Sequence, residues 1–299
     1  TTAANADISL GTSTLGDGTG TDTITLNTTG SGGDATLDNA TTVVVLGTSA
    51  ASLVTSVGGD LTLRSGAAAG ITDSATVTVG GDLAATTDAN SGVIDLDTLA
   101  VTGSVALNTH GNGAATVVNA TVLDFAASTV GGALSATATA GNITDSGVLA
   151  ITGTSTFTVA NGQSVILTES STFSTVTFAA SGGGTIASVT INDSNVLDLG
   201  TLTTTGNLTV TAGGNITDSG TVTVGGDLAV TTNANSSTID LGTLAVDGSM
   251  ALVTHGNGAA TVVNDAGIEF AASTVGGYLA VTTNANSSTI DLDTLAVDG

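Results

Sequence analysis

Cysteine, proline and tryptophan are absent from the 299 residues, and aromatic residues make up only 2%. The lack of cysteine excludes disulfides, thiol catalysis and a thiolate metal site. The shortage of rings excludes a conventional core of large side chains, so the core must be built from Ala, Val, Leu and Ile. Such small branched residues suit thin, closely stacked layers. No apolar run approaches the roughly 18 residues that a membrane-spanning helix requires.

Positive charge is almost as scarce. Arg64 is the sole lysine or arginine, against 25 acidic residues, and the formal net charge is −24. Nucleic acid is excluded as a partner, because its phosphates need cations on the protein. An anionic membrane surface is excluded for the same reason. The excess of negative charge favours solubility and attracts cations.

Long internal repeats occupy much of the chain. Residues 76–134 align without gaps onto residues 221–279 at an offset of 145, with 45 of 59 positions identical. Residues 223–248 match residues 274–299 at an offset of 51, with 24 of 26 identical. Between these copies lies a degenerate segment, 154–204, in which the pattern is weaker. Repeats of this kind are typical of a solenoid whose units stack on one another.

A smaller unit underlies these repeats: a glycine turn followed by an alternating apolar strand. It occurs as "GGDLTL" at Gly58, "GGDLAA" at Gly80 and "TGNLTV" at Thr205. Most units begin about 20–22 residues after the previous one, which is within the range of solenoid repeats. Two units are longer, and both contain "THGNGAATVVN", which begins at Thr109 and at Thr254.

Apolar residues within a unit alternate with a period of two, which predicts short strands joined by Gly, Asn, Asp and Ser turns. No segment has the period of an amphipathic helix. We therefore predict an all-β fold, a right-handed parallel β-helix (β-solenoid) with coils of about 20–22 residues, some of about 29, and about 13 coils in all. A left-handed helix of hexapeptides lacks its six-residue repeat here. An antiparallel sandwich is the main rival, but it would not require near-identical units at a fixed spacing.

The organisation expected is one continuous solenoid over residues 1–299. The chain begins and ends in mid-unit, with no polar cap and no recognisable signal peptide. We expect it to be part of a longer repetitive protein, or a subunit whose ends stack on adjacent repeats or on copies of itself.

The phrases "GNITDSG", which begins at Gly141 and recurs at residues 214–220, and "TLAVDG" carry a family resemblance. They resemble the repeat regions of filamentous-haemagglutinin-like proteins, which are bacterial adhesins of the two-partner secretion type. The resemblance covers most of the chain and lies in the style of the repeat. It implies a right-handed parallel β-helix at the bacterial cell surface or in the extracellular space. It also implies a host or neighbouring cell surface as partner.

Acidic residues recur shortly before most glycine turns. The series is Asp73, Asp95, Asp124, Asp145, Asp198, Asp218, Asp240, Glu269 and Asp291, and Asp97 and Asp293 each add a second carboxylate. In stacked coils these acids are expected to form rows whose like charges repel. A cation that takes several oxygen ligands would relieve the repulsion, and Ca²⁺ is the candidate. The proposed bridging residues are Asp95, Asp97, Asp240, Asp291 and Asp293. The alternative is that they are solvated or turn-forming acids that bind local N–H groups.

Other candidates are weaker. "GDGTGTDTITL" at Gly16 faintly resembles a Ca²⁺-binding nonapeptide repeat, but it occurs once. His110 and His255 lie at equivalent places with no second histidine nearby, so a turn is the simpler interpretation. The turns at Asn90, Asn235 and Asn286 suggest stacked amides. Paired threonines could indicate ice binding, although β propensity explains many of them.

Catalysis finds no support in the sequence. A β-helical carbohydrate-active enzyme would need cationic and aromatic residues, and its acids should break the repeat rather than follow it. The segment that does break the repeat contains Phe157, Gln163, Glu169, Phe173 and Phe178. We expect a structural rod without cofactor. The alternatives are a filament subunit that stacks end to end, a β-helical carbohydrate-active enzyme, or a Ca²⁺- or ice-binding module.

Overall fold

The computed structural model describes residues 4–13, 23–40, 42–47, 54–285, 288–292 and 294–299. The chain forms two compact units, Thr1–Ser155 (unit 1) and Thr156–Gly299 (unit 2). Both are parallel β-solenoids, with about 11 turns in all and roughly 21 residues per turn. The prediction of an all-β parallel solenoid is confirmed, whereas the expected number of coils was too high. That the chain is one continuous solenoid stays a prediction.

Helical structure in the described residues amounts to one 3-10 turn, η1 (Ser181–Gly183). Among those residues, no helix has the length and apolar character that crossing a membrane would demand.

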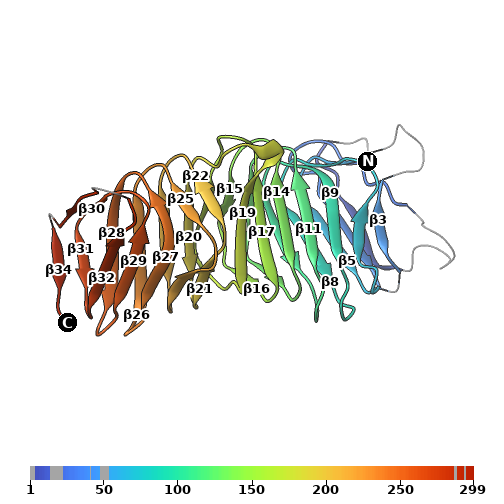
Figure 1. The fold of residues 1–299 in the computed structure, drawn as a ribbon. Coiled ribbons are helices and arrows are strands. Elements are labelled where there is room, and N and C mark those ends of the chain that lie inside the picture. Colours follow the sequence, from blue (N-terminus) through green and yellow to red (C-terminus); the bar gives the residue numbers. More distant parts are fainter. Residues whose placement is uncertain (1–3, 14–22, 41, 48–53, 286–287, 293) are drawn as a thin grey trace. The chain divides into compact units, whose positions relative to one another are not determined.

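Unit 1 contains two parallel sheets whose strands alternate along the chain (Figure 1). The strands of its first sheet are β1 (Ile8–Ser13), β2 (Ala35–Asn39), β5 (Leu61–Ser65), β8 (Leu83–Thr87), β10 (Ser104–Asn108), β12 (Leu123–Phe125), β13 (Ser128–Val130), β15 (Ile143–Asp145) and β16 (Leu149–Ile151). The strands of its second sheet are β3 (Val44–Leu46), β4 (Thr55–Val57), β6 (Ile71–Asp73), β7 (Val77–Val79), β9 (Ile94–Val101), β11 (Ala115–Asn119) and β14 (Leu134–Ala138). Strand β17 (Thr154–Val159) includes the boundary between the units.

Unit 2 repeats this arrangement. Its first sheet contains β18 (Val165–Ser171), β20 (Val189–Asp193), β23 (Leu208–Ala212), β26 (Leu228–Asn235), β28 (Ser249–His255), β30 (Ile268–Phe270), β31 (Ser273–Val275), β33 (Ile290–Asp291) and β34 (Leu295–Val297). Its second sheet contains β19 (Thr175–Ala180), β21 (Leu197–Leu199), β22 (Leu202–Thr204), β24 (Ile216–Asp218), β25 (Val222–Val224), β27 (Ile239–Val246), β29 (Ala260–Asn264) and β32 (Leu279–Thr283).

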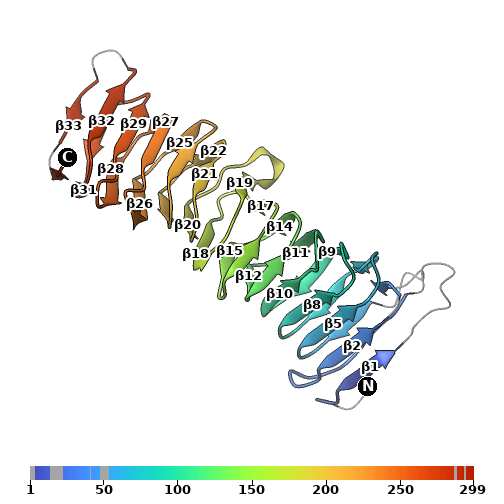
Figure 2. The same cartoon turned by 90° about the horizontal axis from the view of Figure 1, so that it is seen from below.

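Successive coils stack with their equivalent residues in register. Leu61 pairs with Leu83, and Leu83 pairs with Val105, so equivalent positions of successive coils lie side by side (Figure 2). All three side chains are buried, while the residue that follows each of them on its strand is exposed or half-buried. A row of apolar side chains therefore runs through the stacked coils, between the two sheets. Burial of each such side chain contributes about 1.5–3 kcal/mol of transfer free energy.

The two longest spacings between glycine turns do not produce longer coils. Ile94 pairs with Ala115 and Ala115 with Leu134, so the coils here stay close to the general length of roughly 21 residues per turn. The extra residues form an additional strand, β11, and its counterpart in unit 2 is β29. After β11 and β29, the strand that follows the next pair of glycines lies in the second sheet instead of the first. These strands are β14 and β32. The length of about 29 residues expected for these two units was wrong, because the spacing of the glycine turns is not the coil length there.

The glycine turns form a column of their own in unit 1. The N–H of Gly81 donates to the Gly59 carbonyl at 2.9 Å, and the N–H of Gly103 donates to the Gly81 carbonyl at 3.0 Å. A Cβ on Gly81 would lie 2.9 Å from the carbonyl carbon of Gly59, closer than real Cβ atoms approach backbone. The recurring glycine is therefore required by close contact between coils.

Candidate functional site

The acids expected to bind Ca²⁺ alternate with threonines along the stack. Asp95 on β9 lies between Thr72 of β6 and Thr116 of β11. Asp240 on β27 lies in the same way between the threonines of β24 and β29. Both carboxylates are exposed. The predicted rows of neighbouring acids are therefore wrong at these positions, because the coil lengths bring a threonine into register with each acid.

Two acids do meet at one place in unit 2, where Glu269 on β30 pairs in register with Asp291 on β33. Both residues are exposed, so water screens their repulsion. Asp97 is also exposed, and its N–H donates to the Asp73 carboxylate at 3.0 Å. Asp293 lies outside the described residues.

Hydroxyl groups bind two further acids of the series. The Asp124 carboxylate accepts hydrogen bonds from the hydroxyls of Thr144 and Ser146, both at 2.7 Å. The Asp198 carboxylate accepts the equivalent pair from residues 217–219 at 2.9 and 2.5 Å. Each donor pair belongs to the next coil, so these acids join coils together. Hydrogen bonds to a charged acceptor contribute about 1.5–3 kcal/mol each where solvent is excluded, and less at exposed sites.

Backbone N–H groups bind Asp73 and Asp218. Asp73 accepts the N–H groups of Asp97 and Thr98 at 3.0 and 2.9 Å, and the Thr98 hydroxyl at 2.8 Å. Asp218 accepts the same three bonds in unit 2, each at 2.8 Å. Burial raises the pKa of Asp73, and the three hydrogen bonds act against that rise.

A second acidic row, at the glycine turns, was not singled out from the sequence. The N–H of Asp60 donates to the Asp34 carboxylate at 2.9 Å, and the N–H of Asp82 donates to Asp60 at 2.8 Å. Ser104 closes the row, since its N–H donates to Asp82 at 2.7 Å. The signal was available in the recurring "GGDL", whose acid follows the glycine pair. Each acid binds the backbone of the next coil.

The same row in unit 2 mixes amide and acid. The Asn207 side chain accepts the N–H of Asp227 at 2.9 Å, and the Asp227 carboxylate accepts the N–H and the hydroxyl of Ser249, both at 2.9 Å. These two bonds, the backbone bond first, lower the pKa of Asp227. Amide and carboxylate serve equally here, because the Oδ1 atom accepts the bond in either case.

No group of three or more His, Cys, Asp or Glu side chains in the described residues is arranged to hold a metal ion. The carboxylates of Asp73, Asp124, Asp198 and Asp218 find their partners in N–H and hydroxyl groups of neighbouring coils. Bridging by Ca²⁺ at Asp95, Asp97, Asp240, Asp291 and Asp293 stays a prediction. Most of the nonapeptide-like stretch at Gly16 lies outside the described residues.

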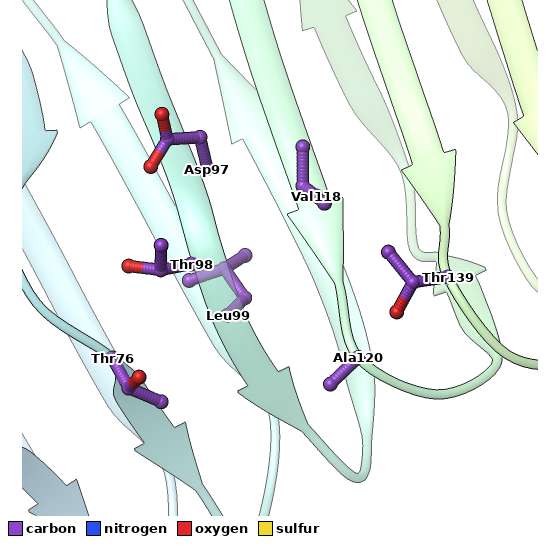
Figure 3. Close-up of a pocket in the computed structure, with 7 residues that line it drawn as sticks. All are labelled: Thr76, Asp97, Thr98, Leu99, Val118, Ala120 and Thr139. Carbon is purple, nitrogen blue, oxygen red and sulfur yellow. The ribbon is translucent and has the colours of Figure 1, made fainter. Parts of the chain in front are cut away.

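A shallow hollow of about 200 Å³ lies beside Asp97 on unit 1 (Figure 3). Its lining residues are Thr76, Asp97, Thr98, Leu99, Val118, Ala120 and Thr139. In the aligned repeat, Gly242 replaces Asp97 and Asp265 replaces Ala120. The carboxylate therefore moves to another coil between copies, so the two repeats do not share one arrangement of polar groups. This favours a surface feature of the solenoid over a binding site.

The histidines belong to tight turns. The carbonyls of His110 and His255 accept N–H groups of Gly113 and Gly258 at 3.2 and 3.1 Å. The Nδ1 atom of His255 lies 2.6 Å from the carbonyl oxygen of Thr232. The proposed amide stack differs from expectation, since Asn235 pairs with His255 rather than with another asparagine. Asn286 lies outside the described residues.

Aromatic side chains cluster in the degenerate segment. The ring of Phe157 lies 6.0 Å from Phe173, edge to face, and 6.0 Å from Phe178, stacked. All three rings are buried. Such pairs contribute about 0.5–1.5 kcal/mol beyond their buried area. These three rings thus form a local apolar core in the degenerate segment, 154–204.

Comparison with protein-family models finds a match over two segments of the chain. Residues 112–180 and 186–247 match a family described as repeats of unknown function (DUF5649). Comparisons with curated proteins and with solved structures found no match. The chain is thus a β-solenoid of stacked repeats that is similar, over these two segments, to the DUF5649 repeats.

Proposed function

We propose that the chain is a structural part of an extracellular protein, a β-helical shaft that displays an adhesive surface of a bacterium. The observation that carries the proposal is what the acidic side chains bind. Acids that an active site would gather in one place are distributed through the coils, where they bind N–H and hydroxyl groups of the next coil. Asp73 in unit 1 and Asp218 in unit 2 make the same three bonds. A repeated bond of this kind supports a repeated structure rather than a reaction.

Charge and composition support the extracellular location. A net charge of −24 keeps the molecule soluble and discourages lateral association. The resemblance to haemagglutinin-like repeats supports a place on the bacterial surface, with a host or neighbouring cell as partner. In this proposal the chain needs neither catalysis nor a cofactor.

A filament subunit is the second candidate. Leu292 and Val297 in unit 2 are 54% and 41% exposed, whereas the equivalent residues of the preceding repeat, Leu241 and Val246, are buried. A further coil would cover them, and it could come from adjacent repeats or from another copy of the chain.

Immunogold electron microscopy of the source cells tests the proposal, with an antibody raised against unit 2. Rods that project from the cell surface and carry label are expected. Label along continuous fibres would favour the filament subunit. Label confined to the cell interior would overturn the extracellular role.

A further inference from the structure

Asp193, the last residue of β20, is a carboxylate buried in the break of the repeat. Its side chain is 1% exposed. The Oδ1 atom accepts the N–H of Asn195 at 3.0 Å and that of Phe173 at 3.5 Å. The Oδ2 atom is buried and has no hydrogen-bond partner among the described residues. A buried, ionised oxygen without a donor is strongly unfavourable.

The same turn occurs in unit 1 with an asparagine in this position. "NATVLD" begins at Asn119, and "DSNVLD" begins at Asp193. Asn119 is likewise fully buried at the end of a strand. Its Oδ1 atom accepts the N–H of Val101 at 2.8 Å, and its Nδ2 atom donates to the carbonyls of Val101 and Val122 at 3.0 and 2.7 Å. In this turn, therefore, the Nδ2 atom of asparagine, which corresponds to Oδ2 of Asp193, is a hydrogen-bond donor.

Other coils with a buried asparagine here use the amide in the same way. The Nδ2 atom of Asn264 donates to the carbonyls of Val246 and Gly267 at 3.1 and 3.0 Å. The Nδ2 atom of Asn39 donates to the Thr42 hydroxyl at 2.7 Å. An acid in this place can supply a donor only as the neutral carboxyl, whose O–H replaces one N–H of the amide.

We propose that Asp193 is a neutral carboxylic acid in folded unit 2, with its Oδ2–H donating to the backbone of the turn at residues 194–196, and that ionisation of this group loosens the coil. Asp193 would thus hold the turn through a pH-sensitive hydrogen bond. The other described acids of the solenoid bind hydrogen-bond donors or contact water. The turn it holds is exposed, since Ser194, Asn195 and Val196 all face solvent. Val196 and Phe173 line a surface hollow of about 530 Å³ above it.

Few charges surround Asp193. On β18, the neighbouring strand, Glu169 is exposed. Strand β23, on the other side, and residues 173–174 and 194–196 contain no titratable group. Asp198 on β21 is bound by two hydroxyls. Unit 2 has no lysine or arginine, because Arg64 is the only one in the chain. No cation of unit 2, other than a protonated histidine, can therefore compensate an ionised Asp193.

The direction of the pH dependence follows from linkage. Burial raises the pKa of Asp193 above 3.8, while its backbone hydrogen bonds act against the rise. The stabilisation is fully present below pH 3.8 and is lost as the pH rises through the pKa of the folded state. Between these two values, each pH unit lowers the folding equilibrium constant about tenfold relative to a chain with a neutral side chain here.

The test compares the full chain with the Asp193→Asn variant in urea unfolding from pH 3 to pH 8. The two proteins are expected to differ most at the upper end of this range, with the variant the more stable, and to converge towards pH 3. A stability difference that does not change with pH would overturn the proposal. Glu169→Gln, which removes an exposed acid from the neighbouring strand, is the matched control and should leave the relative pH profile unchanged.

A second measurement begins with the native chain, so its first result does not require the variant to fold. Infrared spectra of the native chain labelled with ¹³C-aspartate should show a protonated carboxyl band that persists above pH 3.8, the ordinary value. The band should disappear, or weaken by one group, in Asp193→Asn. If all aspartates of the folded native chain ionise at or below the ordinary value, Asp193 is not the neutral acid.

Discussion

At the residue scale, the molecule accommodates 25 acidic residues with a single arginine. Asp82 accepts the N–H and hydroxyl groups of Ser104, and Asp124 accepts two hydroxyls from the next coil. Each of these donors replaces a hydrogen bond that water would otherwise make with the carboxylate. The repeated Asp residues therefore act as connectors between coils, which explains how the chain tolerates a net charge of −24.

Removal of one connector should show its contribution. Asp218→Ala deletes three hydrogen bonds and leaves the N–H groups of Gly242 and Thr243 without this acceptor, so we expect a loss of about 1–3 kcal/mol in the free energy of unfolding. Asp240→Ala is the control, because that carboxylate is exposed and should change stability by less than about 0.5 kcal/mol. Equal losses in urea unfolding would show that Asp218 is not a connector.

The pKa of Asp227 offers a second check at this scale. Ser249 lowers the pKa through its N–H and its hydroxyl, so the associated stability is present above the ordinary value and is lost as the pH falls through the folded-state pKa. Ser249→Ala removes the hydroxyl bond and should shift the pKa of Asp227 upwards towards 3.8, as followed by carboxyl ¹³C NMR. An unchanged pKa would mean that the hydroxyl has no effect.

At the element scale, the short strand and its glycine turn form the unit of construction. In "GGDLAA" at Gly80, Leu83 and Ala85 point into the core and the glycines contact the coil before them. The period of two predicted these strands correctly. The sequence did not predict that β11 and β29 are additional strands, because their glycine spacing alone resembles one long coil.

The glycine column makes a testable claim about close packing. Gly81→Ala would place a Cβ within 3.0 Å of the Gly59 backbone, and we expect it to destabilise unit 1 by about 1–3 kcal/mol. Gly11→Ala is the control, since a Cβ there would meet nothing within 4 Å. Thermal unfolding followed by circular dichroism compares the two. If Gly81→Ala is tolerated as well as the control, the column does not constrain the turn.

The partners of the acids were harder to predict than the strands. Asp95 lies next to Thr72 and Thr116 only because successive coils differ in length. The first coils, in which Ile8 pairs with Ala35 and Ala35 with Leu61, are longer than those that follow. A shift of a few residues decides whether an acid faces another acid or a hydroxyl. Ile71 pairs with Ile94, and the acid follows two places after the first but one place after the second, so Asp95 lies beside Thr72 rather than Asp73.

At the scale of the whole molecule, the single cation lies within stacked strands. Arg64 on β5 is 2.6 Å from Asp88 and 3.8 Å from Asp38, and its strand pairs with β2 on one side and β8 on the other. Because the chain has no lysine and no other arginine, trypsin can cut only after residue 64.

Trypsin should therefore cleave the folded chain far more slowly than the urea-unfolded chain. Cleavage requires β5 to leave its sheet, so the rate should follow local opening of the coil. Gel electrophoresis over time would follow the appearance of fragments 1–64 and 65–299. Rapid cleavage of the folded chain would show that β5 is not held between its neighbours.

The axial spacing of the coils tests the central claim most directly. Electron cryomicroscopy or fibre diffraction of the native material should show a repeat of about 4.8 Å, the distance between hydrogen-bonded strands of neighbouring coils. Extended particles with that repeat are the result expected of stacked parallel coils that form a shaft. Compact particles without such a repeat would contradict both the solenoid and the structural role proposed for it.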